Sequence, residues 1–83
     1  MRAQITLAMD NLEAVLGKAG YSLSNLVRLN YYTTSIDLLF ENYQELIVRR
    51  LEKAGCQPSS TLLGVAGLAF PGLMIEIEAT AVR

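Results

Sequence analysis

The stretch PSSTLLGVAGLAFPGLMIEIEATAV, residues 58–82, decides the fold of this chain of 83 amino acids. Its last part, residues 73–82, alternates between an apolar set and a mixed set, which is the two-residue period of a strand with one buried face. Glu76 and Glu78 belong to the mixed set. The apolar set, which we expect to face the core, consists of Leu73, Ile75, Ile77, Ala79 and Ala81.

The first part of the same stretch, residues 58–66, predicts a second strand. Both of its alternating sets contain apolar side chains, so we expect this strand to lie centrally in a sheet with both faces covered. Residues 67–72 connect the two strands and end in Pro71-Gly72, a dipeptide typical of turns.

The N-terminal residues predict an amphipathic helix that begins close to Met1 and ends at Gly20, where a glycine suits the left-handed conformation of a helix C-terminus. Apolar residues recur there at spacings of three and four, while polar residues occupy the other face. The apolar stripe consists of Ile5, Ala8, Met9, Leu12, Val15, Leu16 and Ala19.

The middle of the chain predicts a strand and then a second helix. Residues 26–34 are rich in β-branched and aromatic side chains, which favours a strand. The sequence Thr34-Ser35-Ile36-Asp37 matches a capping box, and the helix that it begins should end at Ala54-Gly55. Its apolar stripe consists of Ile36, Leu39, Phe40, Tyr43, Leu46, Ile47, Leu51 and Ala54.

The expected order of elements is therefore helix, strand, helix, strand, strand, in a single domain of residues 1–83. The first two strands should lie parallel because a helix connects them, and the last strand should run antiparallel. This is an α+β fold, a two-layer sandwich of two helices on a mixed β-sheet. The second face and both edges of a three-stranded sheet would be left bare.

Composition points to an oligomer and argues against binding to nucleic acid or membranes. Hydrophobic residues make up 52% of this small chain and the mean hydropathy is +0.31, so part of the apolar surface should be buried against other subunits. Cys56 is the only cysteine and cannot form an internal disulfide, which favours a reducing compartment and a cytoplasmic location. The net charge of -1, the pI of about 5.2 and the absence of an apolar span or signal sequence argue against nucleic-acid, membrane and secreted roles.

The residues that could carry chemistry are few, because the chain has no histidine and hence neither the usual base nor the usual metal ligand. Glu76 and Glu78 lie about 7 Å apart on one strand face, so burial of both would raise one carboxyl pKa through repulsion. The alternative is that they form a solvated strand face. Cys56 is a candidate nucleophile, but it has no flanking base and a structural role fits better. We expect no metal and no cofactor.

The chain resembles the YjgF/RidA family, also called endoribonuclease L-PSP, over essentially its whole length. The C-terminal IEIEATAV, residues 75–82, after a strand led by Pro58 carries the likeness. Upstream motifs extend it: NLEAVL at residues 11–16, AG at 19–20, VRLNYYTT at 27–34 and FENY at 40–43.

The resemblance implies a chorismate-mutase-like subunit in a homotrimer, with small-molecule sites in clefts between subunits. Family members usually begin with additional strands, so this sequence is similar to a member shortened at its N-terminus. Either Met1 is an internal start, or another chain occupies the open edge.

The resemblance also implies enamine or imine hydrolysis, such as deamination of 2-iminobutanoate or 2-iminopropanoate. Glu76 matches the acid that orients the hydrolytic water. The family's carboxylate-gripping arginine is replaced by Ser60, which puts this activity in doubt. Substrate contacts are expected from Ser60, Thr61 and Leu62. The remaining alternatives are a ligand-binding or structural oligomer, and a ribonuclease as the older family name implies, which the acidic pI and the lack of histidine oppose.

Overall fold

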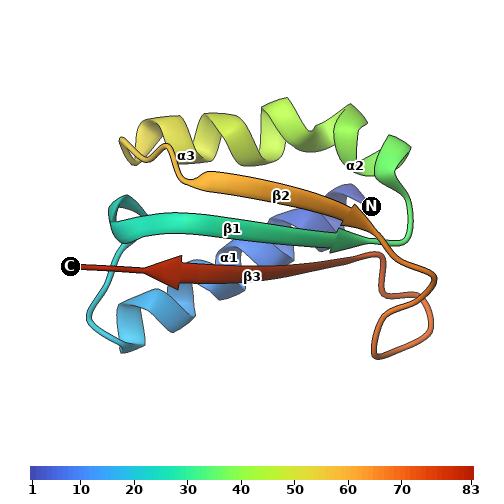
Figure 1. Cartoon of the computed structure of the whole chain (residues 1–83), viewed down its shortest axis with the longest axis horizontal. Coiled ribbons are helices and arrows are strands. Elements are labelled where there is room, and N and C mark those ends of the chain that lie inside the picture. Colours follow the sequence, from blue (N-terminus) through green and yellow to red (C-terminus); the bar gives the residue numbers. More distant parts are fainter.

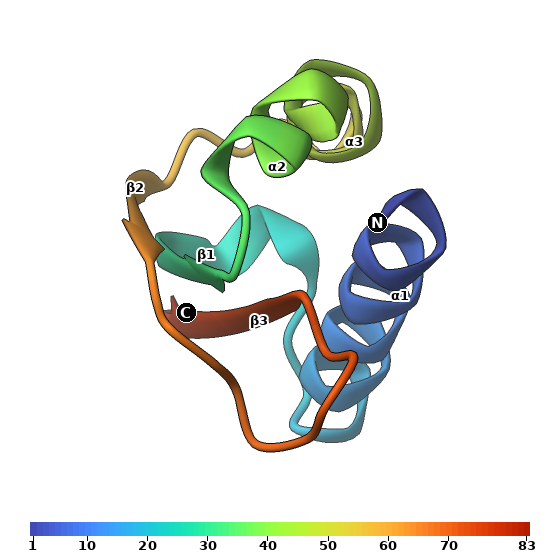
Figure 2. The ribbon, with the colours of Figure 1, turned by 90° about the vertical axis from the view of Figure 1, so that its right-hand side faces the viewer.

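A computed structural model describes all residues, 1–83, and shows a three-stranded sheet with helices on one face (Figures 1 and 2). The α+β sandwich expected from the sequence is confirmed. In chain order the elements are α1 (Arg2–Lys18), the 3₁₀ turn η1 (Leu23–Asn25), β1 (Leu26–Thr33), α2 (Ile36–Tyr43), the π-helical segment η2 (Gln44–Val48), α3 (Arg49–Lys53), β2 (Ser59–Gly64) and β3 (Ile75–Ala81).

The sheet order is β2-β1-β3, so β1 is the central strand. As expected, β1 and β2 are parallel and β3 is antiparallel. The expectation that the strand after Pro58 lies centrally was wrong, because β2 is an edge strand and its Leu63 is 47% exposed. Apolar residues on both faces of β2 signal a strand that needs further cover, and within one chain that cover is missing.

The two faces of the sheet differ in what covers them. The helices all lie on the same side of the sheet, with α1 against β3 and α2 against β2 (Figure 2). On that side β1 contributes Leu29, Tyr31 and Thr33, all completely buried. The opposite side, which we call the open face, has no helix above it.

The second helix is continuous in direction but is interrupted by the π-helical segment η2. Its buried residues Leu39, Ile47 and Leu51, with half-buried Tyr43 between them, are spaced four apart. An α-helix turns about 100° per residue, so three steps of four residues would carry the buried stripe about 120° around the axis. The wider π turn takes up this drift and keeps the stripe on the sheet.

The end of β1 is tied to its surroundings through Thr33. Its hydroxyl lies 2.8 Å from the carbonyl oxygen of Met74, to which it donates, and 3.1 Å from the backbone N–H of Ser35, from which it accepts. The helix cap is Ser35, whose Oγ accepts from the N–H of Leu38, so the expected cap at Thr34 was wrong by one residue. One buried hydroxyl thus joins β1, the start of α2 and the start of β3.

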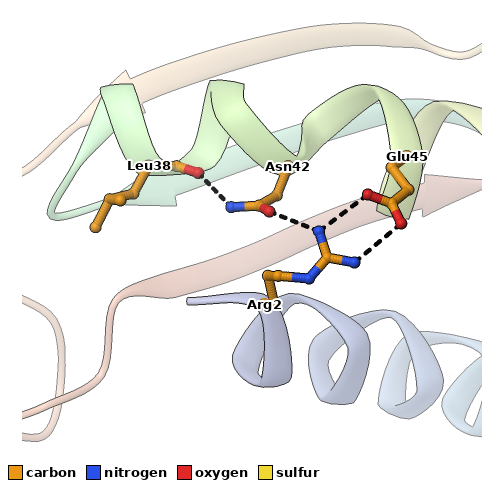
Figure 3. Close-up of polar contacts among 4 residues, drawn as sticks. All are labelled: Arg2, Leu38, Asn42 and Glu45. Carbon is orange, nitrogen blue, oxygen red and sulfur yellow. Dashed lines mark hydrogen bonds and ion pairs between the residues drawn. The ribbon is translucent and has the colours of Figure 1, made fainter.

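Two arginines join α1 to the second helix. Arg2 donates bidentately to Glu45 and also to the Oδ1 of Asn42, whose own amide donates to the carbonyl oxygen of Leu38 (Figure 3). Farther along, Arg50 pairs with Asp10 and Glu13, each at 2.7 Å. The Arg2–Glu45 pair is about half exposed and fixes orientation more than stability.

The core lies between the helices and the sheet. Several expected members of the helical stripes are not in it: Val15 and Phe40 are 65% and 63% exposed, and Ile36 is at the margin with 40%. Helical period alone does not reveal how wide the covered stripe is. The buried core consists of Ile5, Met9, Leu16, Leu23, Leu26, Leu29, Tyr31, Leu39, Ile47, Leu51, Cys56 and Ile75.

Candidate functional site

The residues expected to form the site lie at opposite edges of the sheet. Ser60, Thr61 and Leu62 are on β2, and Glu76 is at the start of β3, with β1 between them. Two strand spacings separate the edges, which is about 10 Å between backbones. One chain therefore does not bring Glu76 together with the β2 residues.

The two faces of the sheet divide the candidates further. Thr61 and Glu76 are on the open face, in register with Asn30 and Tyr32 of β1. Ser60 is in register with buried Leu29 and therefore lies on the helix side, although it is exposed. Leu62 is on that side too, beside Tyr31 in the register.

The surroundings of Ser60 include an unusual buried hydroxyl. The Oη of Tyr31 is buried without a hydrogen-bond partner, and burial raises the pKa of this phenol, with Tyr43 adding to the effect and Ser60 opposing it. The Oγ of Ser60 donates to the carbonyl oxygen of Pro58 at 3.4 Å. A side chain at position 60 therefore lies close to the rim of the core as well as to the sheet edge.

The open face carries a polar network centred on Glu78. Its Oε1 accepts from the amide of Asn30 at 2.9 Å and from the hydroxyl of Tyr32 at 3.0 Å. These two hydrogen bonds, with a smaller contribution from Arg28, lower the pKa of Glu78 below its ordinary value. Glu78 is therefore an acceptor held in place, and it is ionised at neutral pH.

The expected repulsion between Glu76 and Glu78 depended on burial, and the structure exposes both carboxylates. The pKa of Glu78 is lowered where repulsion would have raised it. Glu76 accepts no hydrogen bond from another side chain in this chain. It is therefore the carboxylate of the open face that is free to contact a ligand or water.

Arg28 crosses the open face from β1 toward β2. Its Nη1 donates to the Oγ of Ser59 and its Nη2 to the Oγ1 of Thr61, both at 3.2 Å. No carboxylate lies within ion-pair distance of this guanidinium. Arg83, by contrast, is at the far end of the chain, where it donates to the carbonyl oxygen of Gly20 and lies over the ring of Tyr21.

An apolar groove of about 440 Å³ runs between α1 and the free edge of β3. Leu12 and exposed Val15 form its helix wall, and Ile77 and Ala79 form its sheet wall. Glu76 lies at the border of this groove. The carboxylate and the groove are thus both at the β3 edge.

The chain also has one thiol, that of Cys56. The Sγ of Cys56 is buried and lies 3.8 Å from the carbonyl oxygen of Leu26, and burial raises the thiol pKa, so it fits the structural role. No three His, Cys, Asp or Glu side chains are grouped as metal ligands. No helix is long and apolar enough to span a bilayer.

The strand period of residues 26–34 also places Arg28, Asn30 and Tyr32 together on one side, but from the sequence we did not expect Arg28 to substitute for the missing arginine, and we expected Tyr32 to fill a core or an interface. Their shared alternation along β1 was the available signal. Their partners on β2 and β3 depended on the strand order, which the sequence did not reveal, because the expected central strand proved to be an edge.

These features define a class: a two-layer α+β subunit whose sheet has one polar open face, two free edges and its candidate residues divided between those edges. The family model for endoribonuclease L-PSP matches residues 1–83. The chain belongs to this family, which includes the YjgF and Rid proteins.

Solved structures agree with this assignment. Rv2704 from Mycobacterium tuberculosis, of the YjgF/YER057c/UK114 family, has a TM-score of 0.89 and 33% identity, covering 99% of this chain and 67% of that protein. TdcF with bound serine and the YjgF gene product, both from E. coli, have TM-scores of 0.88 and 0.87 at 25% identity, each covering 99% of this chain. The chain spans 64% of each E. coli protein. No curated protein matches significantly.

Proposed function

We propose that this chain is a RidA-like small-molecule-handling protein whose site forms between subunits. The observation that carries the proposal is the placement of Glu76 at one edge of the sheet and of Ser60, Thr61 and Leu62 at the other. A neighbouring subunit that brings its β3 edge beside β2 would unite the two halves. A homotrimer is the assembly that we propose, and the exposed apolar side chains and free edges support burial against neighbours.

The proposed chemistry is hydrolysis of a small enamine or imine acid. Water adds to the carbon of the C=N bond, the C–N bond breaks, ammonia leaves and a 2-oxo acid remains. Glu76 accepts a proton from the attacking water and returns one to the departing nitrogen. Its exposure and its freedom from other side chains suit this role.

The replacement of an arginine by Ser60 makes this hydrolysis slow. A serine hydroxyl donates one hydrogen bond but carries no charge to balance a substrate carboxylate, whereas a guanidinium donates two in a fork. That TdcF was solved with bound serine supports a small amino-acid-like ligand for this chain too.

The test is hydrolysis of 2-iminobutanoate generated in the assay, measured above the spontaneous rate, together with solution mass. We expect a slow enzymatic rate from a trimer, loss of that rate in Glu76→Gln and its retention in the matched variant Glu78→Gln. Ser60→Arg should raise kcat/KM about tenfold or more, the effect of one added charge-assisted fork. A rate that survives Glu76→Gln, or a monomer with full activity, would contradict the proposal.

A further inference from the structure

We infer that Arg28 is the carboxylate-recognising group of the open face, supplying from β1 a positive charge that neither Thr61 on the same face nor Ser60 on the helix side provides. This inference rests on the proposed function, since it names what binds the acid group of that ligand. It concerns a residue on a different strand from the one at which the family resemblance implies such a contact.

The first argument is position. β1 and β2 are adjacent and parallel, and Arg28 is in register with Ser59. The guanidinium reaches over β2 to the hydroxyls of Ser59 and Thr61. Both residues share the open face with Glu76, while Ser60 between them lies on the helix side. The charge therefore lies at the β2 edge, where the proposed cleft has its ligand-binding half.

The second argument is the chemical state of the guanidinium. It donates two hydrogen bonds to neutral hydroxyls and leaves three of its five N–H donors without a protein acceptor. Arg2 and Arg50, by contrast, have their charge paired with carboxylates. Arg28 is held in place by its hydroxyl partners yet remains available to an anion, which lowers the cost of ordering it upon binding.

The third argument concerns the opposing negative charge. Glu78 is the acid of this face whose pKa Arg28 helps to lower, and it is already engaged by Asn30 and Tyr32 on the β3 side. Arg28 extends in the other direction, toward β2. An anion that approaches over Ser59 and Thr61 therefore meets the guanidinium before it meets the carboxylate.

The experiment uses 2-oxobutanoate as the probe and its neutral amide as the comparison, titrated into the intact protein while the Nε–H signal of Arg28 is followed by NMR. We expect the Arg28 signal to shift with the acid and not with the amide. Arg28→Gln should weaken binding of the acid about tenfold or more. Arg28→Lys keeps the charge but loses the fork, so its affinity for the acid should lie between those of the parent chain and Arg28→Gln.

The matched control is Arg49→Gln, which removes an exposed arginine that likewise lacks a carboxylate partner but lies in the helical layer. It should bind the acid as the parent chain does. Equal affinity of the parent chain and Arg28→Gln for the acid, or no binding by the parent chain, would overturn the inference. Imine hydrolysis that depends on Glu76 but not on Arg28 would leave the proposed function standing while the inference fails.

Discussion

Thr33→Val is expected to destabilise the fold strongly although it barely changes the size of the side chain. The hydroxyl of Thr33 is completely buried, donates to the carbonyl oxygen of Met74 and accepts from the N–H of Ser35. Each hydrogen bond contributes about 1 kcal/mol net, and an N–H left without an acceptor adds a further penalty. We therefore expect a loss of about 2 to 3 kcal/mol, a large share of the stability of a small domain.

Urea unfolding followed by circular dichroism measures this loss. With a slope of about 1 kcal/mol per M, the midpoint should fall by about 2 to 3 M while the slope stays constant. The matched control is Thr34→Val, since Thr34 is exposed and its hydroxyl makes no hydrogen bond to the protein; its free energy of unfolding should change by less than about 0.5 kcal/mol. Equal effects of the two substitutions would refute the assignment of Thr33 as the junction of β1, α2 and β3.

Two further predictions concern Tyr31, whose hydroxyl should add no stability, and Glu78, whose contribution to stability should depend on pH. Tyr31→Phe should leave the free energy of unfolding unchanged or raise it by up to about 1 kcal/mol in the same urea experiment, because the Tyr31 hydroxyl is buried without a partner; a loss of 2 kcal/mol or more would contradict this. The folded pKa of Glu78 is lowered, so its contribution to stability is present above the ordinary carboxyl pKa and is lost as pH falls through the folded value. NMR titration should give Glu78 a pKa below that of an ordinary glutamate, and Asn30→Ala should move it upward; an unchanged pKa in Asn30→Ala would show that the amide does not hold the carboxylate.

The sequence predicted most elements because their apolar periods are clear. The alternation in residues 73–82 gave β3 its correct faces, and the glycines at the helix ends were correct because Gly20 and Gly55 adopt positive φ, at 83° and 70°. Both positions follow from local chemistry, which a single sequence contains.

What could not be predicted depends on contacts between distant segments. The strand after Pro58 carries apolar residues on both faces, and that pattern is the same for a central strand and for an edge strand awaiting another subunit. The π turn was also missed. The apolar residues Leu39, Tyr43, Ile47 and Leu51 are four apart and look like one stripe of an α-helix, but on an α-helix this spacing would carry the stripe around the axis, and the π turn takes up that rotation.

The sequence predicted which residues belong to the candidate site, but not that they lie on two opposite edges of the sheet. Glu76 and Ser60 are only 16 positions apart in the sequence, yet β1 lies between their strands. The contacts of Arg28 with Ser59 and Thr61 became visible only when β1 and β2 were found in register.

The two unlike free edges of the sheet make assembly a question of symmetry. A contact between the β2 edge of one copy and the β3 edge of the next is heterologous, because different surfaces meet, and it can be repeated by every added copy. If each step rotates the next copy by a third of a turn, three copies close into a ring and no edge remains open. A rotation that does not close, or one combined with a shift along the axis, gives a helical fibre that grows without limit, so the geometry between neighbours separates a finite particle from a polymer.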